Sequence, residues 1–513
     1  MFNFIRKYIE KEKESQYKKP KESPYEKEKL SINLEDNLIK IREICRGSSD
    51  ITIQKMRISG INCALITCEG MYDLDSLSRL MLRPLTKLRI KDCTEERLFK
   101  YLNTNTMLSA DQKIFYTFSE LFDYAMSGFG ILLFENKNCG IAFGIQGFPS
   151  RSIAEPSSEM NIRGSREGFV ESVKVNMTMV RRRLKTPDLC FEMSKAGMKS
   201  KTNICIVYRK DMVSEELLYD VKSRLLSVKL DNVLESGYLQ PFLENRKMSL
   251  FSGVGSTERP DTFCAKICEG RVGILVDGTP FALTVPKLFA ENFQSFDDYS
   301  IKPFYTALIR FLKYTAFFIS TMLPGLYVAI ATFHPELVPE ALLYNIAAAE
   351  ENTPFPLFFE AFIIHLFYEV MREAGLRLPR AVGHTVSIIG ALIVGDAAVT
   401  AGLIGAPMVM VVALTAISSF VLPTLYETTA FLRFMYILAG GFLGLFGISV
   451  LFCLVFINLC SVNNYGIPTT SPLSPLSIYS LRDIFIRKGW RYLGKEDLNI
   501  SNIAGSDIKE NIN

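Results

Sequence analysis

Long apolar runs occupy much of the chain between residues 314 and 460. Residues 314–333 and 434–460 carry no charged side chain, and residues 384–426 carry a single one, Asp396. A helix of about 20 apolar residues reaches across the ~30 Å hydrocarbon layer of a bilayer. We therefore predict a polytopic α-helical membrane domain over residues 301–462.

The run at 384–426 is too long for one crossing, and its centre holds two glycines and a proline. Gly402, Gly405 and Pro407 favour a tight turn that divides the run into two spans. With the two charge-free runs, the sequence predicts four spans, at 314–333, 384–402, 407–426 and 434–460.

A fifth apolar segment, residues 354–371, carries an ionisable stripe. Glu360, His365 and Glu369 lie close to one face of a helix. Such a helix either spans the membrane inside a bundle or beside water, or it lies along the interface. The sequence thus predicts a membrane domain of four to five spans.

The distribution of basic residues orients these spans. Lys and Arg side chains precede the first span, and the loop at 334–353 has carboxylates but neither Lys nor Arg. By the positive-inside rule, the large N-terminal region is cytoplasmic. Five crossings would leave the basic C-terminal segment outside, and four would leave Arg372 to Arg380 outside. Both topologies stay open at this point.

Residues 31–150 have the pattern of a small α/β unit. The apolar run Ile61–Thr67 predicts a buried strand, and two further runs flank the polar Glu135–Cys139 as in a β-hairpin. We expect helices at 75–82, 95–102 and 114–126, the last ending before Gly128.

Residues 166–300 predict a second α/β unit, joined to the first by a polar linker at 151–165. Apolar residues at helical spacing predict a helix over 168–185. Asp277-Gly278 between two apolar runs predicts a β-hairpin. The basic cluster Arg181–Arg183 forms either a solvated face or a contact with anionic lipid.

The two ends of the chain are polar. Residues 1–30 are rich in Lys and Glu, which predicts a disordered tail, and residues 463–513 predict a Pro-rich and then basic tail. The chain has 58 Lys and Arg residues against 54 Asp and Glu residues, and this balance gives no argument for nucleic-acid binding.

The motifs indicate neither metal nor cofactor chemistry. The pairs Cys63/Cys68 and Cys264/Cys268 each lack a matching second pair, and there are only 3 histidines, so zinc is not expected. Buried, reduced thiols are the stronger interpretation of the 11 cysteines. The sequence also has no phosphate-binding loop, nucleophile elbow or metalloprotease helix. We therefore expect no cofactor and no enzyme.

Several long stretches, in the right order, resemble the A subunit of GerA-type spore germinant receptors. The resemblance is dense over residues 150–480 and loose over 31–149. A glutamate is more usual in the family at the position of Asp396, so the carboxylate is kept. The stretches include EPSSEMNIRGSREGF (155–169), GRVGILVDGTPFAL (270–283), LPGLYVAIATFHPELVP (323–339), REAGLRLPRAVG (372–383) and GIPTTSPLSPL (466–476).

This resemblance implies a protein of the spore inner membrane with a two-part cytosolic N-terminal region. It implies partnership with a transporter-like B subunit, which recognises the nutrient, and with a lipoprotein C subunit. The A subunit would form an oligomeric ring and a channel. Nutrient binding would then lead to ion release and germination.

Two other function classes compete with this receptor and channel subunit. A secondary transporter fits intramembrane carboxylates and helices interrupted by Gly or Pro, but no repeat relates 314–371 to 384–460. A membrane-bound enzyme needs a nucleophile, a base and an orienting group, and the sequence shows no such constellation.

The intramembrane carboxylates are the first candidate functional residues. Asp396 lies within an apolar run, where a charge costs about 2.5–3.5 kcal/mol, so it needs water or a partner such as Arg372 or His365. One interpretation is a paired structural residue. The other is that Asp396, with Glu360 or Glu369, faces a cation path in a ring of subunits.

Three glycines on the last predicted span are candidates for helix packing. Gly440, Gly444 and Gly447 are three and four residues apart. Small residues on one face let helix backbones approach closely, so we expect this face to meet another helix. Glycines that face lipid are the alternative.

Overall fold

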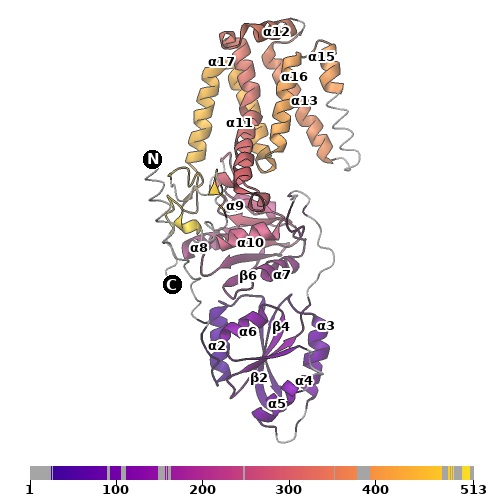
Figure 1. Cartoon of the computed structure of the whole chain (residues 1–513), viewed down its shortest axis with the longest axis vertical. Helices are drawn as coiled ribbons and strands as arrows, with labels where there is room; N and C mark the ends of the chain where they lie inside the picture. Colours follow the sequence, from indigo (N-terminus) through magenta and orange to yellow (C-terminus); the bar gives the residue numbers. More distant parts are fainter. Residues whose placement is uncertain are drawn as a thin grey trace.

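The computed structural model shows two sheet-based units in a column beneath a bundle of long helices (Figure 1). Leu30 is 4% exposed and Lys29 bridges to Thr117, so the ordered first unit begins before residue 31. Most of the expected N-terminal tail and of the linker at 151–165 lies outside the described residues. The structure describes residues 25, 27–88, 90, 93–104, 111–147, 156, 159, 163–245, 249–351, 353–377, 393–476, 483–485, 487, 489 and 499–508.

The first unit is a five-stranded sheet with strand order β1-β2-β4-β5-β3 and antiparallel pairing throughout. Helices α2 and α6 cover one face, and α4 and α5 help to cover the other. The expected strand and β-hairpin are confirmed as β2 and as β4 with β5. The bounds are α2 Leu34–Ile44, β1 Ile51–Ile58, β2 Ile61–Cys68, α3 Leu74–Ser76, a π-helical stretch Leu77–Leu82, α4 Arg83–Lys87, α5 Glu95–Thr104, β3 Gln112–Phe115, α6 Phe118–Ala125, β4 Phe129–Phe134 and β5 Gly140–Gly144.

The helix expected at 114–126 is wrong in its first turn. Residues Gln112–Phe115 form an edge strand instead, and α6 begins at Phe118. Thr117 sets the boundary, because its hydroxyl accepts the Glu120 N–H while the Glu120 carboxylate accepts the Thr117 N–H. This capping box starts the helix and leaves the preceding residues free to pair with β5.

The second unit repeats the architecture with strand order β6-β7-β9-β10-β8. Helices α7 and α10 pack on one face, and α8 and α9 on the other. The β-hairpin expected at Asp277-Gly278 is confirmed. The bounds are α7 Val173–Arg183, β6 Leu189–Ala196, β7 Thr202–Arg209, α8 Glu215–Leu226, α9 Gln240–Leu243, β8 Gly255–Thr257, α10 Pro260–Cys268, β9 Val272–Val276 and β10 Ala282–Val285.

Helix α7 is shorter than the expected 168–185. Its first N–H, from Val173, bonds to the Asp277 carboxylate at 3.0 Å, and this contact from another part of the unit marks the helix start. Residues before it run extended, and Phe169 N–H bonds to Glu258 O at 2.7 Å.

The C-terminal segment differs from the polar tail that we expected. Residues after the last helix form short strands β11 (Asn463–Asn464) and β12 (Ile467–Pro468). Tyr465, Ile467, Ile500 and Ile508 then join the apolar core between the second sheet and α8. These four side chains are buried because they cover apolar residues of the second unit that would otherwise be exposed.

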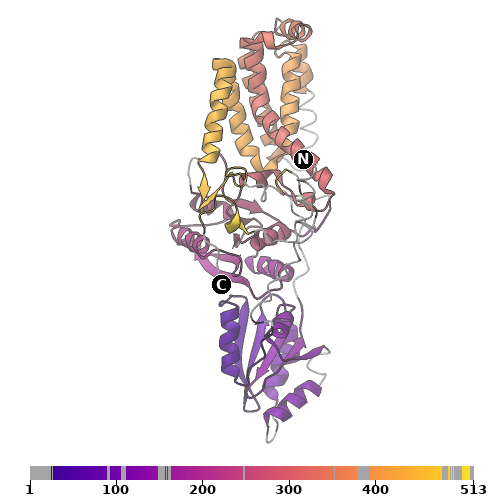
Figure 2. The ribbon, with the colours of Figure 1, turned by 60° about the vertical axis from the view of Figure 1, so that its left-hand side comes forward.

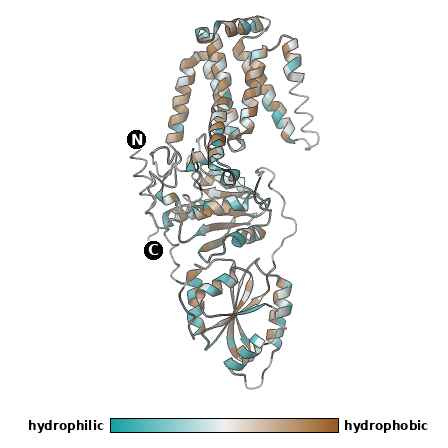
Figure 3. Ribbon diagram, viewed as in Figure 1, coloured by the Kyte–Doolittle hydropathy of each residue, from teal (hydrophilic) through white to brown (hydrophobic). Residues whose placement is uncertain are grey.

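The helical bundle stands above the second unit, and Figure 3 shows that hydrophobic residues dominate it. Two stretches, Pro303–Phe333 and Pro423–Cys460, are long and apolar enough to cross a membrane, and Ala406–Phe420 is apolar but shorter. Most of the expected span at 384–402 lies outside the described residues. The bounds are α11 Pro303–Phe333, α12 Glu340–Glu350, α13 Leu357–Arg377, a π-helical stretch Ile393–Ala397, α15 Ala398–Thr400, α16 Ala406–Phe420 and α17 Tyr426–Cys460.

Helix α16 ends at Phe420, six residues before the end that we expected for its span. Pro423 explains the early end, since proline has no N–H and its ring clashes with the carbonyl of the fourth residue before it. A short 3₁₀ turn at Pro423–Leu425 then leads into α17.

Helix α17 folds back on itself, so the single span expected at 434–460 is wrong. Gly444 has the non-helical angles φ 60° and ψ −147°. Both ends bond to Leu250: Thr428 Oγ1 donates to its carbonyl at 2.7 Å, and Asn458 Oδ1 accepts its N–H at 3.2 Å. In a straight helix, residues 428 and 458 would lie about 45 Å apart. The second half instead descends toward the second unit (Figure 2).

Candidate functional site

The buried carboxylate of Glu360 caps a neighbouring helix. Glu360 is 1% exposed on α13, and its Oε1 accepts the N–H of Gly405 at 2.5 Å. Helix α16 begins at the next residue, Ala406. The first N–H groups of a helix have no partner within it and attract negative charge, so Glu360 stabilises the start of α16.

The second α13 carboxylate, Glu369, ties three helices together. Arg433 Nη1 donates to it at 2.8 Å, Arg372 Nε donates at 3.3 Å, and the Tyr426 hydroxyl also donates. Arg433 is fully buried, and its Nε donates to Ser320 O on α11 at 3.0 Å. This network links α11, α13 and α17 at the end of the bundle near the second unit.

Between the two carboxylates, the bundle interior is polar and incompletely bonded. His365 is fully buried, and its Nδ1 lies 2.8 Å from Ala361 O. Among the described residues, the buried side-chain atoms without a hydrogen-bond partner include three from this interior: His365 Nε2, Glu360 Oε2 and Arg433 Nη2. Buried polar atoms of this kind are usually satisfied by internal water, which needs several polar neighbours.

Asp396 lies apart from this interior. It is exposed in the π-helical stretch, and no described residue forms an ion pair or hydrogen bond with it. Of the partners expected from sequence, Arg372 bonds to Glu369 and lies over the Tyr426 ring, while His365 is buried inside the bundle. The structure therefore does not bring Asp396 together with Glu360 or Glu369.

The three glycines pack within the same chain. A Cβ on Gly440 would lie 2.4 Å from Gly325 O, which shows how closely α11 approaches the first half of α17. A Cβ on Gly447 would lie 2.5 Å from Ala439 O, so this glycine lets the two halves of α17 meet. Gly444 provides the bend between them.

The basic cluster at the end of α7 is paired with carboxylates and lies away from the bundle (Figure 1). Arg181 is 1% exposed and donates to Asp50 of the first unit from Nε at 2.7 Å and from Nη2 at 3.1 Å. Arg182 and Arg183 both bond to Glu167, at 2.7 and 2.5 Å. The expectation of a solvated face is therefore wrong for Arg181, which joins the two units. Arg182 and Arg183 remain partly exposed and hold the chain that leads into α7.

Sequence reasoning missed both Arg181 and Arg433 as partners of buried carboxylates. Arg181 lies four residues after Met177, on the face that packs inward, and this spacing was an available signal. Arg433 directly precedes a charge-free run, where a cation needs a carboxylate from another segment. Arg259 and Asp261 also form a nearly buried ion pair, at 2.6 Å.

Comparison with known proteins decides the family. The family described as Bacillus/Clostridium GerA spore germination protein matches residues 39–497 of this chain. The chain belongs to the GerA family. The resemblance drawn from the sequence is thereby confirmed, and it is a family of germinant receptor A subunits involved in spore germination.

Individual GerA relatives match most of the chain. Spore germination protein KA of Bacillus subtilis (strain 168) is 36% identical over 90% of this chain and 85% of its own. Spore germination protein GerLA of Bacillus cereus is 33% identical over 89% of this chain and 94% of its own. The N-terminal domain of the A subunit of the Bacillus megaterium germinant receptor GerK3, a crystal structure, matches with 28% identity and a TM-score of 0.42, covering 51% of this chain and 97% of that one.

GerA membership also bears on location. Two helical stretches of this chain are long and apolar enough to cross a membrane, and a further relative, 37% identical over 90% of both chains, is named an uncharacterized membrane protein, YfkQ of Bacillus subtilis (strain 168). Together with the family, the two stretches indicate a membrane-associated protein.

Proposed function

We propose that this chain is the channel-forming A subunit of a nutrient-sensing germinant receptor in the spore inner membrane. Copies of the chain assemble into a ring, and a transporter-like B subunit and a lipoprotein C subunit complete the receptor. The B subunit recognises the nutrient. The ring of A subunits then releases ions, and germination follows.

The observation that carries this proposal is the exposed carboxylate of Asp396. An ionised side chain that faced lipid within a span would cost about 2.5–3.5 kcal/mol on insertion scales. Its position on the bundle surface, with no partner among the described residues, favours a neighbouring copy or a water-filled path. Carboxylates repeated around a ring attract cations and repel anions, which is the chemistry of a cation pore.

The fold-back of α17 supports a topology that satisfies the positive-inside rule. We propose four crossings, by α11, α13, residues 384–402 and α16, followed by the hairpin of α17. The hairpin halves, 426–443 and 445–460, provide about 27 and about 24 Å of helix, and a hairpin returns the chain to the side it came from whether or not its tip crosses. The N-terminal units, Arg372–Arg377 and the C-terminal segment then all lie in the cytoplasm.

The channel is tested with the variant Asp396→Asn. This substitution keeps the shape of the side chain but removes its charge. Reconstituted in liposomes with its partner subunits, the variant should insert normally, yet lose nutrient-triggered cation flux, and spores carrying it should fail to germinate on the nutrient. The matched control is Glu340→Gln, which removes an exposed carboxylate at the start of α12.

Three outcomes separate the interpretations of Asp396. Normal protein level with normal flux and germination would contradict the proposal. Loss of the protein itself would indicate that Asp396 is a paired structural residue. Nutrient-dependent solute uptake against a gradient, without passive cation flux, would favour a secondary transporter instead.

A further inference from the structure

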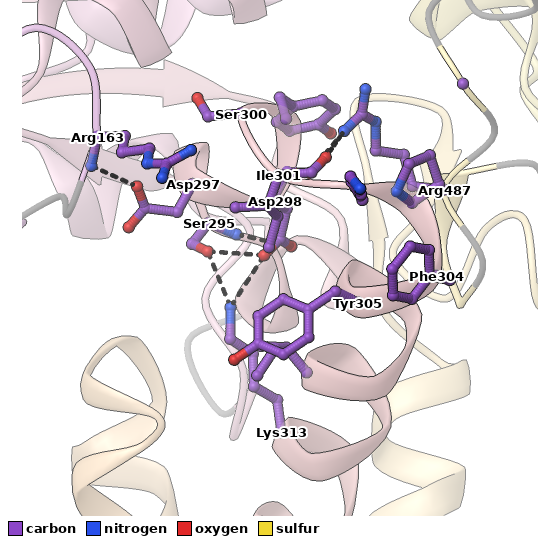
Figure 4. Close-up of a pocket in the computed structure, with 15 residues that line it drawn as sticks. Arg163, Ser295, Asp297, Asp298, Ser300, Ile301, Phe304, Tyr305, Lys313 and Arg487 are labelled. Atoms are coloured by element: carbon purple, nitrogen blue, oxygen red, sulfur yellow. Dashed lines mark hydrogen bonds and ion pairs between the residues drawn. The ribbon is translucent and has the colours of Figure 1, made fainter.

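A cavity of about 960 Å³ opens at the base of α11, where the bundle meets the second unit. Its wall is formed by the turn that precedes α11 and by the first turns of that helix, with Arg163 and Arg487 contributed from distant parts of the chain (Figure 4). The apolar run of α11 starts at Tyr314, immediately after the last cavity residue of the helix, Lys313. In the proposed topology, the cavity therefore lies at the cytoplasmic surface of the membrane.

The wall of this cavity is basic. It holds four cations, Arg163, Lys302, Lys313 and Arg487, against two carboxylates, Asp297 and Asp298. Both carboxylates already accept hydrogen bonds from the protein, and Asp298 also pairs with the fully buried Arg310, at 2.9 Å. The cavity thus presents positive charge to whatever enters it.

The basic side chains differ in how firmly they are held. Arg487 is 2% exposed and donates to the carbonyls of Asp298 and Ile301 at 2.8 and 3.0 Å, so its guanidinium is fixed in the wall. Lys313 Nζ donates to Ser295 Oγ at 3.0 Å and pairs with Asp298 Oδ1 at 3.7 Å, so its charge is already partnered. The Lys302 side chain is exposed, and no described residue pairs with its charge. The wall thus combines a fixed guanidinium with an ammonium group that is free to bind.

Exposed apolar side chains flank the cavity on α11. Phe304, Tyr305 and Leu308 are 73%, 48% and 53% exposed, and Phe311 one turn further is 67% exposed. A basic pocket beside exposed aromatic and aliphatic groups matches the two ends of a phospholipid, since the phosphate meets cations and the acyl chains meet the apolar face. A small soluble anion would use only the first of these features.

We propose that this cavity binds the phosphate headgroup of an anionic phospholipid, with Lys302 and Arg163 contacting the phosphate and the acyl chains lying along Phe304 and Leu308. The proposal rests on the membrane topology proposed above, but not on ion conduction. A bound headgroup would hold the start of α11 against the second unit.

The test measures lipid binding by the full-length protein in detergent, using phosphatidylglycerol, phosphatidylcholine and inorganic phosphate as separate probes. Native mass spectrometry and thermal unfolding provide the two readouts. The double variant Lys302→Gln/Arg163→Gln removes two exposed cations of the cavity. The matched control, Lys195→Gln/Lys201→Gln, removes two exposed cations elsewhere on the second unit.

Phosphatidylglycerol should bind and stabilise the wild type and the control. Its affinity for the cavity variant should be about tenfold or more lower, because each basic residue near a phosphate contributes to the binding free energy. Equal binding by wild type and cavity variant, or equal binding of both lipids, would overturn the proposal. Stabilisation by inorganic phosphate alone would identify a soluble anion instead and would also overturn it. Asp396→Asn should leave lipid binding unchanged, so a failure here is distinguishable from a failure of the channel proposal.

Discussion

At the scale of single residues, one buried ion pair joins the two N-terminal units. Asp50 and Arg181 are both almost fully buried, and the guanidinium also donates to Thr186 O and Leu189 O at 2.7 and 2.9 Å. On the same interface, Glu69 and Lys174 form a pair that remains exposed, at 2.7 Å. The two pairs join the same units in different environments, so they allow a direct comparison.

The substitution Arg181→Met should lower the free energy of unfolding by about 3–5 kcal/mol, because the Asp50 carboxylate stays buried without its partner. The substitution Lys174→Gln should lower it by only about 0–1 kcal/mol, since water screens the exposed pair. Pulse proteolysis of the full-length protein in urea measures both free energies of unfolding. Similar values for the two variants would show that the buried pair does not hold the interface.

The cysteines of this interface give a second residue-scale prediction. Burial raises the pKa of Cys45 to about 12 and that of Cys190 to about 11, so both thiols stay neutral near pH 8. Iodoacetamide at that pH should label the partly exposed Cys93 and Cys268 of the two units well before Cys45 and Cys190. Mass spectrometry of the alkylated peptides, with a urea-unfolded control, checks the order. Early labelling of Cys45 would mean that the units separate readily.

At the scale of helices and strands, local patterns predicted the elements better than their ends. The apolar runs of β2 and β9 and the Asp277-Gly278 turn gave correct strands because neighbouring residues alone decide them. The start of α6 was missed, since the apolar residues of β3 continue the helical pattern and only Thr117 interrupts it. The carboxylates of α13 were found from sequence, but their partners Gly405 and Arg433 lie far along the chain.

Gly444 gives the prediction at this scale. Its φ of +60° is costly for a residue with a side chain, by about 1–2 kcal/mol, and an added Cβ would lie 3.1 Å from the Phe333 ring. Gly444→Ala should therefore lower the melting temperature in detergent and the yield from membranes. Gly395→Ala is the control, because its nearest neighbour would be 3.7 Å away and its φ is not positive. Equal behaviour of the two variants would argue against the bend.

At the scale of the whole molecule, the second unit is built from two distant parts of the chain. Tyr465, Ile467, Ile500 and Ile508 belong to its core, and Asn245 Nδ2 donates to Asn463 O across that junction at 2.5 Å. The sequence did not predict this, because isolated apolar residues in a polar segment carry no periodic pattern. We therefore expect the N-terminal units alone to be less stable than the units joined to this segment.

A fragment of residues 25–300 should accordingly bind more of a hydrophobic dye and unfold earlier than the same fragment joined to residues 461–508. Within the longer fragment, Ile467→Ala should cost about 2–5 kcal/mol, since this side chain is fully buried. In both fragments, limited proteolysis should cut first near residues 151–165, the proposed linker. A first cut inside α7, or no difference between the fragments, would contradict this division.

The position of the C-terminal segment has a consequence for how the protein is made. About 180 residues, most of them in the helical bundle, are translated between the end of the second unit's sheet, at Val285, and Tyr465, the first C-terminal residue of its core. Because translation adds roughly 5–20 residues per second, the apolar face of the second unit stays uncovered for on the order of ten seconds or more. In the proposed topology, insertion of the bundle therefore precedes the closing of this core, and a chain that stalls during insertion would keep an apolar face exposed to proteases.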